Sequence, residues 1–190
     1  AERQCLHLLE NINSEEFEVG IVYLNEGSKP PSLKNIQLFK IERGNYTNIK
    51  NIYQQIRNIF DLFQPHLAHV WLPEIVTVPA SIIAYKRNIP IVAGHRKTIN
   101  FSTDLVSMMR DFLRMPQYLL STTIVSNFDV SEELLPFRFL YKKKNGQCIY
   151  NGINTERLMD LNQEKLPSTS INKLIFAGRL APQKGLKTIL

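Results

Sequence analysis

The segment Leu174–Leu186 holds the residue types that are best suited to bind a charged ligand. Its first residues are apolar and predict a buried strand, which leads into Gly178, where a ligand can approach the backbone closely. Arg179 offers a planar guanidinium group that matches phosphate oxygens, and Lys184 adds a compact second positive charge. The N-terminus of the helix expected next would add oriented N–H groups. We predict that this segment binds a diphosphate at the carboxyl end of a strand; an ordinary strand-to-helix turn with surface cations is the alternative.

Short apolar, β-branched runs alternate with helical stretches along the chain before this segment. The helix at 49–63 has Thr47 or Asn48 as its cap, and Gln64-Pro65 ends it. Alternation of this kind indicates parallel β-α-β units and a doubly wound, Rossmann-like α/β fold. We expect strands at 17–24, 36–41, 67–72, 89–93, 121–126 and 147–150, and helices at 1–12, 49–63, 76–87, 102–113 and 131–135.

A polar stretch at 161–172 separates this pattern from a new strand at 173–177. We interpret 1–160 as one domain, 161–172 as a linker and 173–190 as the start of a second domain, with its strand outside the first sheet. The chain begins in a helix and ends inside one. We therefore expect the first strand of the first domain, and most of the second domain, to lie beyond this sequence.

Composition narrows the class of protein. The net charge is +6, and the run formed by Arg138 and Lys142–Lys144 contains no acidic residue, although a solvated loop is the simplest interpretation of it. Basic residues do not interleave with aromatic ones, so we expect no nucleic acid partner. No apolar run reaches the ~18 residues of a membrane span, and the start does not have the pattern of a secretory signal. Cys5 and Cys148 fit no metal or redox spacing, which favours a cytoplasmic location.

The stretch from Arg96 to Met115 mixes cations with large apolar residues. Such a helix would suit an anionic membrane surface or a lipid-linked acceptor. Core packing of the methionine-rich face is the alternative. The apolar residues are Phe101, Met108, Met109, Phe112, Leu113 and Met115, and the cations are Arg96, Lys97, Arg110 and Arg114.

Several motifs, in order, resemble family 4 of the retaining GT-B glycosyltransferases. Phe176–Gly185 is similar to that family's strand, Gly-Arg-Leu and Lys-Gly segment, and Ala1-Glu2-Arg3 resembles the end of its Gly-Gly-Ala-Glu-Arg start. Tyr150–Asn154 resembles the turn that closes the first domain, with Asn154 where the family has Asp. Phe128 stands where the family often has Ser. The weaker matches are His69–Pro73, Asn88–Val92 and Thr123–Asn127.

The resemblance implies a GT-B enzyme in which two Rossmann-like domains hold a nucleotide-sugar donor and a glycan or lipid-linked acceptor between them. Transfer would retain the anomeric configuration and need no metal or other cofactor. The enzyme would act in the cytoplasm, in cell-surface polysaccharide or glycoconjugate synthesis, with peripheral attachment to the inner face of the membrane as an option. By itself, this chain is expected not to transfer sugar.

The same resemblance assigns roles to individual residues. His95 is the candidate catalytic residue, through a hydrogen bond to the donor sugar, and a solvated basic loop is the alternative for this segment. The residues expected to bind the donor diphosphate are Gly178, Arg179 and Lys184. The residues expected to line the substrate cleft are Arg96, Asn151 and Gly152.

Two other functions stay open. The first is a non-catalytic binding module built on a degenerate Rossmann-like domain. The second, less favoured, is a nicotinamide-dependent oxidoreductase, which needs a G-x-G-x-x-G motif after a strand. The sequence contains no such motif.

Overall fold

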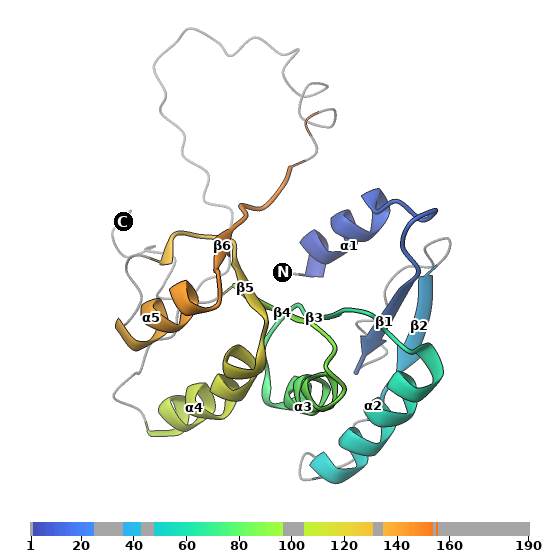
Figure 1. The fold of residues 1–190 in the computed structure, drawn as a ribbon, viewed down its shortest axis with the longest axis horizontal. Coiled ribbons are helices and arrows are strands. Elements are labelled where there is room, and N and C mark those ends of the chain that lie inside the picture. The colour runs from blue at the N-terminus through green and yellow to red at the C-terminus, as the bar shows by residue number, and fades with distance from the viewer. Residues whose placement is uncertain are drawn as a thin grey trace, which may run out of the picture. The chain divides into compact units, whose positions relative to one another are not determined.

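The computed structural model describes residues 2–24, 36–42, 48–96, 105–130, 135–153 and 155 (Figure 1). The chain divides into two compact units, Ala1–Gly152 and Ile153–Leu190. The described helices and strands all belong to the first unit. The predicted linker at 161–172 and the predicted strand at 173–177 lie outside the described residues, so the domain boundaries stay a prediction.

Helices and strands alternate along the first unit, as the sequence predicts. In chain order they are α1 (Glu2–Asn11), β1 (Val19–Tyr23), β2 (Ile36–Lys40), α2 (Ile49–Phe63), β3 (Ala68–Val70), the 3₁₀ turn η2 (Ile75–Thr77), α3 (Val78–Lys86), β4 (Ile91–His95), α4 (Leu105–Leu120), β5 (Thr123–Ser126), α5 (Leu135–Lys143) and β6 (Gln147–Cys148).

The strand pairs of the described part are all parallel, which confirms the predicted α/β class. β3, β4, β5 and β6 form one sheet in that order, whereas β1 and β2 form a separate pair. We expected one continuous sheet; strand pairing depends on tertiary contacts that leave no local signal in the sequence. Helices α3, α4 and α5 connect successive strands of the larger sheet, so its four strands end at the same edge.

Helix α2 shows how the sequence sets an element's ends. The Asn48 Oδ1 atom accepts a hydrogen bond from the Asn51 N–H at 3.1 Å, as an N-cap residue should. At the other end Gln64 adopts a left-handed conformation with φ 48°, and Pro65 follows it. The prediction that Asn48 is one of the two candidate caps, and that Gln64-Pro65 ends the helix, is confirmed.

Two apolar cores hold the helices on the strands. Helix α3 packs against both α2 and α4, and the three lie side by side in Figure 1. The first core joins α2, β3, α3 and β4 through Ile41, Ile52, Ile56, Phe60, Val70, Ile83, Ala84 and Ile91. The second joins β4, β5, α4 and α5 through Ala93, Tyr118, Ile124, Phe137, Leu140 and Tyr141.

The basic run near residue 140 corrects one prediction. Helix α5 occupies the place where we expected a solvated loop, because Phe137, Leu140 and Tyr141 are buried at helical spacing. Lys142 and Lys143 lie in its last turn, where positive charge is favourable beside the helix dipole. The predicted short helix at 131–135 falls almost entirely outside the described residues.

The core assignment predicts unequal effects of two substitutions in α2. Ile56 is 3% exposed within the first core, whereas Leu62 is 76% exposed on the same helix. Ile56→Ala should lower the free energy of unfolding by about 2–5 kcal/mol, because it removes buried methyl groups and leaves a cavity. Leu62→Ala should change it by less than about 0.5 kcal/mol. Urea unfolding followed by circular dichroism measures both; similar losses would contradict this packing.

Candidate functional site

The residues that follow the strands of the larger sheet meet at its carboxyl edge. Trp71 follows β3, Arg96 follows β4, Asn127 follows β5, and the chain after β6 leads to Asn151. The register places His95 opposite Ser126, and the Asn127 N–H donates to the His95 carbonyl at 3.3 Å. Ligands of parallel sheets usually bind beyond this edge.

Arg96 connects three of these strand ends. Its Cζ atom lies 3.7 Å from the centroid of the Trp71 ring, a cation–π contact. Its Nη1 atom donates to the Asn151 Oδ1 atom at 3.2 Å. Loss of water contact lowers the pKa of Arg96, and the nearby Cys5 opposes that shift, yet the group remains a cation at neutral pH. The contacts fix the plane of the guanidinium group before any ligand arrives.

Gly94 of β4 lets the backbone at Trp71, just after β3, pass close enough for Trp71 to stack on Arg96. A Cβ atom at Gly94 would lie 2.5 Å from the Trp71 carbonyl oxygen. That separation is too short for a side chain, and the clash is with backbone. Any residue but glycine at this position would therefore push Trp71 away from Arg96.

The first turn of α1 lies at the same edge. The Gln4 Nε2 atom donates to the Gly152 carbonyl oxygen at 2.9 Å, although 148 positions separate the two residues. Burial raises the pKa of the Cys5 thiol, and the positive charge of Arg96 acts in the opposite direction. N–H groups in the first turn of a helix carry partial positive charge. The helix and Arg96 together make this edge suitable for an anionic group.

Two buried polar atoms at this edge have no hydrogen-bond partner within the described part of the chain. They are the Arg96 Nε atom, a donor, and the Asn127 Oδ1 atom, an acceptor. A buried polar group without a partner costs about 1–3 kcal/mol. The two atoms follow neighbouring strands, and because both are buried, a bound molecule can pair with them only after a local opening of this edge.

His95 lies at the carboxyl end of β4, but its side chain is 0% exposed. The ring stacks on Phe137 with centroids 4.2 Å apart, and its Nδ1 atom is 3.2 Å from the Tyr118 hydroxyl oxygen. Phe128 packs on it as well, with centroids 5.1 Å apart. A contact with the donor sugar requires an exposed ring edge, which His95 does not have here. We therefore leave His95 out of the candidate site and assign it to the second core.

His69 lies beside the Arg96 cluster. Its ring centroid is 5.0 Å from that of Trp71. Burial of the ring, and then the positive charge of Arg96, lower the pKa of His69 from 6.5 to about 4, although the residue keeps an exposed surface. At neutral pH His69 is therefore uncharged. Because the unfolded chain binds this proton more readily, folding becomes less favourable as the pH falls from about 6.5 towards 4.

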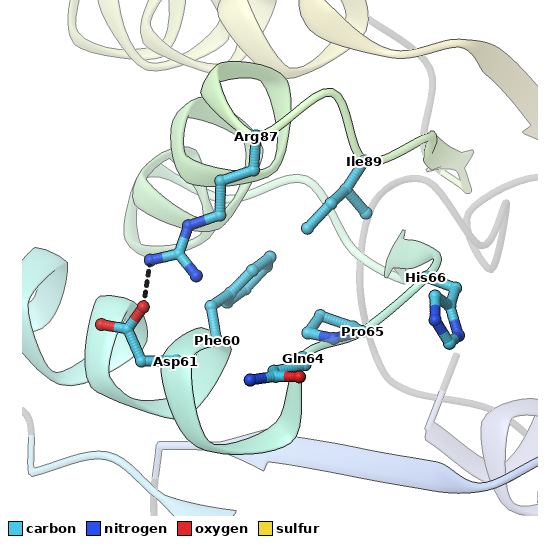
Figure 2. A pocket seen from close by; sticks show the side chains of 7 residues that line it. All are labelled: Phe60, Asp61, Gln64, Pro65, His66, Arg87 and Ile89. Carbon is cyan, nitrogen blue, oxygen red and sulfur yellow. Dashed lines mark hydrogen bonds and ion pairs between the residues drawn. The ribbon is translucent and has the colours of Figure 1, made fainter.

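A pocket of about 350 Å³ lies at the opposite edge, near the starts of β3 and β4 (Figure 2). Inside it Arg87 pairs with Asp61 at 2.7 Å, and its Cζ atom is 5.8 Å from the centroid of the Phe60 ring. The remaining lining residues are Gln64, Pro65, His66 and Ile89. Since the carboxyl edge is the usual ligand edge of such sheets, we prefer the Arg96 cluster as the candidate site.

The structure places some of the predicted site residues and leaves others undescribed. Arg96, Asn151 and Gly152 lie together at the carboxyl edge. Gly178, Arg179 and Lys184 lie outside the described residues, so their contact with a diphosphate stays a prediction. The described residues contain no group of three or more His, Cys, Asp or Glu side chains that could hold a metal ion.

Sequence reasoning missed four residues of this edge, namely Gln4, Cys5, Trp71 and Asn127. Trp71 had a signal, because it is the chain's one tryptophan and comes at the end of a predicted strand. The predicted strand ran to residue 72, which placed Trp71 inside it rather than after it. For Gln4 and Cys5 the contact is between distant parts of the chain and leaves no local pattern.

Protein families and curated proteins do not identify this chain. No protein-family model matches the chain, and no curated protein matches it. The described residues include no helix that is both long and apolar enough to cross a membrane.

The electrostatic contact between Arg96 and His69 can be tested directly. Arg96→Met should raise the pKa of His69 above about 4, while burial, the larger cause, keeps it below the ordinary 6.5. The His69 ring signals followed by NMR during a pH titration give this value. Lys86→Met, which removes an exposed cation of α3, serves as the control and should leave the His69 titration unchanged. An unchanged midpoint in Arg96→Met would show that the two groups are not close.

Proposed function

We propose that the protein is a retaining GT-B glycosyltransferase that transfers a sugar from a nucleotide-sugar donor to a glycan or lipid-linked acceptor. The observation that supports this most is the carboxyl-edge cluster, in which Arg96 bonds Asn151 and lies near Gly152. These are the residues that the resemblance assigns to the substrate cleft. Synthesis of cell-surface polysaccharide or glycoconjugate is the proposed setting, in the cytoplasm.

The cluster has the chemistry that such a cleft needs. A nucleotide sugar and many acceptors carry phosphate and hydroxyl groups, which pair well with a guanidinium donor and an amide acceptor. Arg96 has an unpaired Nε–H and Asn127 an unpaired side-chain oxygen, and both are buried, so a substrate reaches them only after a local opening of the edge. Because Trp71 and Asn151 hold the guanidinium plane, little ordering remains to be done when the substrate binds.

The transfer step places a second demand on the protein. The bond between the anomeric carbon and the donor's diphosphate oxygen breaks, a bond from that carbon to the acceptor's hydroxyl oxygen forms, and the hydroxyl proton passes to the departing diphosphate or to water. Negative charge develops on the departing diphosphate. Arg179 and Lys184 are proposed to stabilise that charge through preorganised contacts, and no metal is required for this role. We assign no nucleophile or base.

A non-catalytic binding module is the alternative that uses the same cluster. Such a module would bind the nucleotide sugar at the carboxyl edge but would not turn it over. Steady-state measurements therefore separate the two functions, because only an enzyme releases the nucleoside diphosphate repeatedly.

Substitution of the two cations tests the proposed transfer in the full-length gene product. Arg179→Ala and Lys184→Ala should each lower the turnover number by about 10²–10³, because each removes one charge contact to a developing anion. Lys184→Arg should restore only part of the rate, since a flat guanidinium group and a compact ammonium group differ in shape. The assay is steady-state transfer with a panel of nucleotide sugars.

Lys187→Ala removes a nearby cation with no assigned role and should keep the rate close to that of the unchanged protein. Circular dichroism checks that each variant is folded. Near-normal rates in both Arg179→Ala and Lys184→Ala would refute the diphosphate role of this segment and remove the main chemical support for the proposed function.

A further inference from the structure

The β1–β2 pair and the larger sheet each have an open edge. A strand at the edge of a sheet presents a row of backbone N–H and C=O groups that another strand can bond. Within the described part of the chain, β1 pairs only with β2, and β3 pairs only with β4. Each of these two strands therefore has one side on which no described strand lies.

The hydrogen bonds of β1 show which of its backbone groups face the open edge. In a parallel pair, one residue directs both its N–H and its C=O to the neighbouring strand, and the next residue directs both away. The Ile41 N–H donates to the Tyr23 carbonyl oxygen at 2.8 Å, so Tyr23 bonds β2. By the same alternation Ile21 also bonds β2, whereas Val22 turns its N–H and C=O towards the open edge.

Strand β3 has the same arrangement. The Ala68 N–H donates to the Pro90 carbonyl oxygen at 3.0 Å, so Ala68 bonds β4 and His69 turns both backbone groups towards the open edge. Exposure agrees with this, because Val22 is 42% exposed and His69 is exposed as well. β4, which is paired on both sides, is buried at four of its five positions, as strands in the middle of a parallel sheet normally are.

Helix α2 packs against both sheets. The ring of Phe63, its last residue, meets Phe39 of β2 with centroids 5.8 Å apart, and a Cβ atom on Gly20 of β1 would lie 3.2 Å from the same ring. Phe60 of α2 shares the first core with Val70 of β3. The start of β1 therefore lies near the end of α2, and β3 begins a few residues after that end. The two strands thus start on the same side of the molecule and run in the same direction.

The position of α1 indicates which segment can pair with these edges. Helices α2, α3, α4 and α5 each connect two described strands, and a helix that connects parallel strands starts at their carboxyl edge. α1 starts at this edge too, because Gln4 in its first turn bonds the Gly152 carbonyl oxygen, and it leads to β1. α1 therefore has the position of a crossover helix that follows a parallel strand of its own.

We propose that one further parallel strand, formed by the residues that precede Ala1 in the full-length gene product, pairs with β1 on one side and with β3 on the other. A single sheet then runs in the order β2, β1, added strand, β3, β4, β5, β6. In a doubly wound sheet the first strand likewise lies in the middle, between the second and the fourth. The carboxyl end of the added strand lies beside the residues that follow β3. This proposal rests on the fold and does not depend on the glycosyltransferase function.

A strand of the same chain fits these edges better than a strand of another protein. Such a strand is joined directly to α1, so its pairing is an intramolecular step at a high effective concentration. Direct pairing of β1 with β3 is the other way to close both edges, and the structure does not have it.

Amide hydrogen exchange in the full-length gene product, followed residue by residue by NMR, tests the proposal. The amides of Val22 and His69 should exchange at rates within about tenfold of those of β4, because both donate to the added strand. Nuclear Overhauser contacts from both amides should lead to residues that precede Ala1. Rapid exchange of both amides, contacts between β1 and β3 themselves, or contacts to a segment that follows Ala1 would each overturn the proposal.

Proline substitution gives an independent test in the same protein. Proline is tolerated where the N–H of a strand residue faces solvent, but not where that N–H bonds a neighbouring strand. Val22→Pro should therefore lower the melting temperature about as much as Ile21→Pro, because the Ile21 N–H bonds β2 and the Val22 N–H bonds the added strand. Val22→Ala is the matched control for loss of the side chain and should lower it less.

Thermal unfolding followed by circular dichroism compares the three variants. A Val22→Pro protein that melts like Val22→Ala would show that this edge of β1 is open and would contradict the proposal. The exchange measurement uses the unchanged protein, so it decides the question even where a proline variant fails to fold.

Discussion

The Arg96 guanidinium group joins strand ends that are far apart in the sequence. It stacks on Trp71, which follows β3, and bonds Asn151, which follows β6, while Arg96 itself follows β4. The stack depends on the close approach of β3 at Gly94, where a side chain would clash with the Trp71 backbone. The position of the candidate site thus depends on a planar cation held between an aromatic ring and an amide, which preserves its orientation without a ligand.

The sequence predicts the local elements of this fold well and their assembly less well. The cap at Asn48 and the end at Gln64-Pro65 have short-range chemical causes, so α2 is recovered from residue patterns alone. Helix α5 was missed because three lysines near its end favoured a solvated loop, although Phe137 and Leu140 carry the helical spacing that buries it. The separation of the β1–β2 pair from the larger sheet has no local signal, since it depends on which edges meet in space.

For the candidate site too, the sequence predicts some features and misses others. The resemblance assigned Arg96 and Asn151 to one cleft, and they share one edge because each follows a strand and parallel strands all end on the same side. The position of His95 at the end of β4 did not predict that its side chain is buried. Neighbouring residues of β4 are buried on both faces of the strand, and the rings that enclose His95 come from α4, α5 and the chain after β5. Because these rings come from distant parts of the chain, the burial of His95 leaves no local pattern in the sequence.

The central claim is that substrate binds at the carboxyl edge beside Arg96, Asn127 and Asn151. NMR of the Arg96 Nε–H and of the Asn127 and Asn151 side-chain amides, during titration of the full-length gene product with a panel of nucleotide sugars, tests it most directly. The account predicts that one donor shifts these signals saturably, while those of Asn58 on α2 stay unchanged. Donor binding that leaves the Arg96 and Asn127 signals unmoved would contradict it.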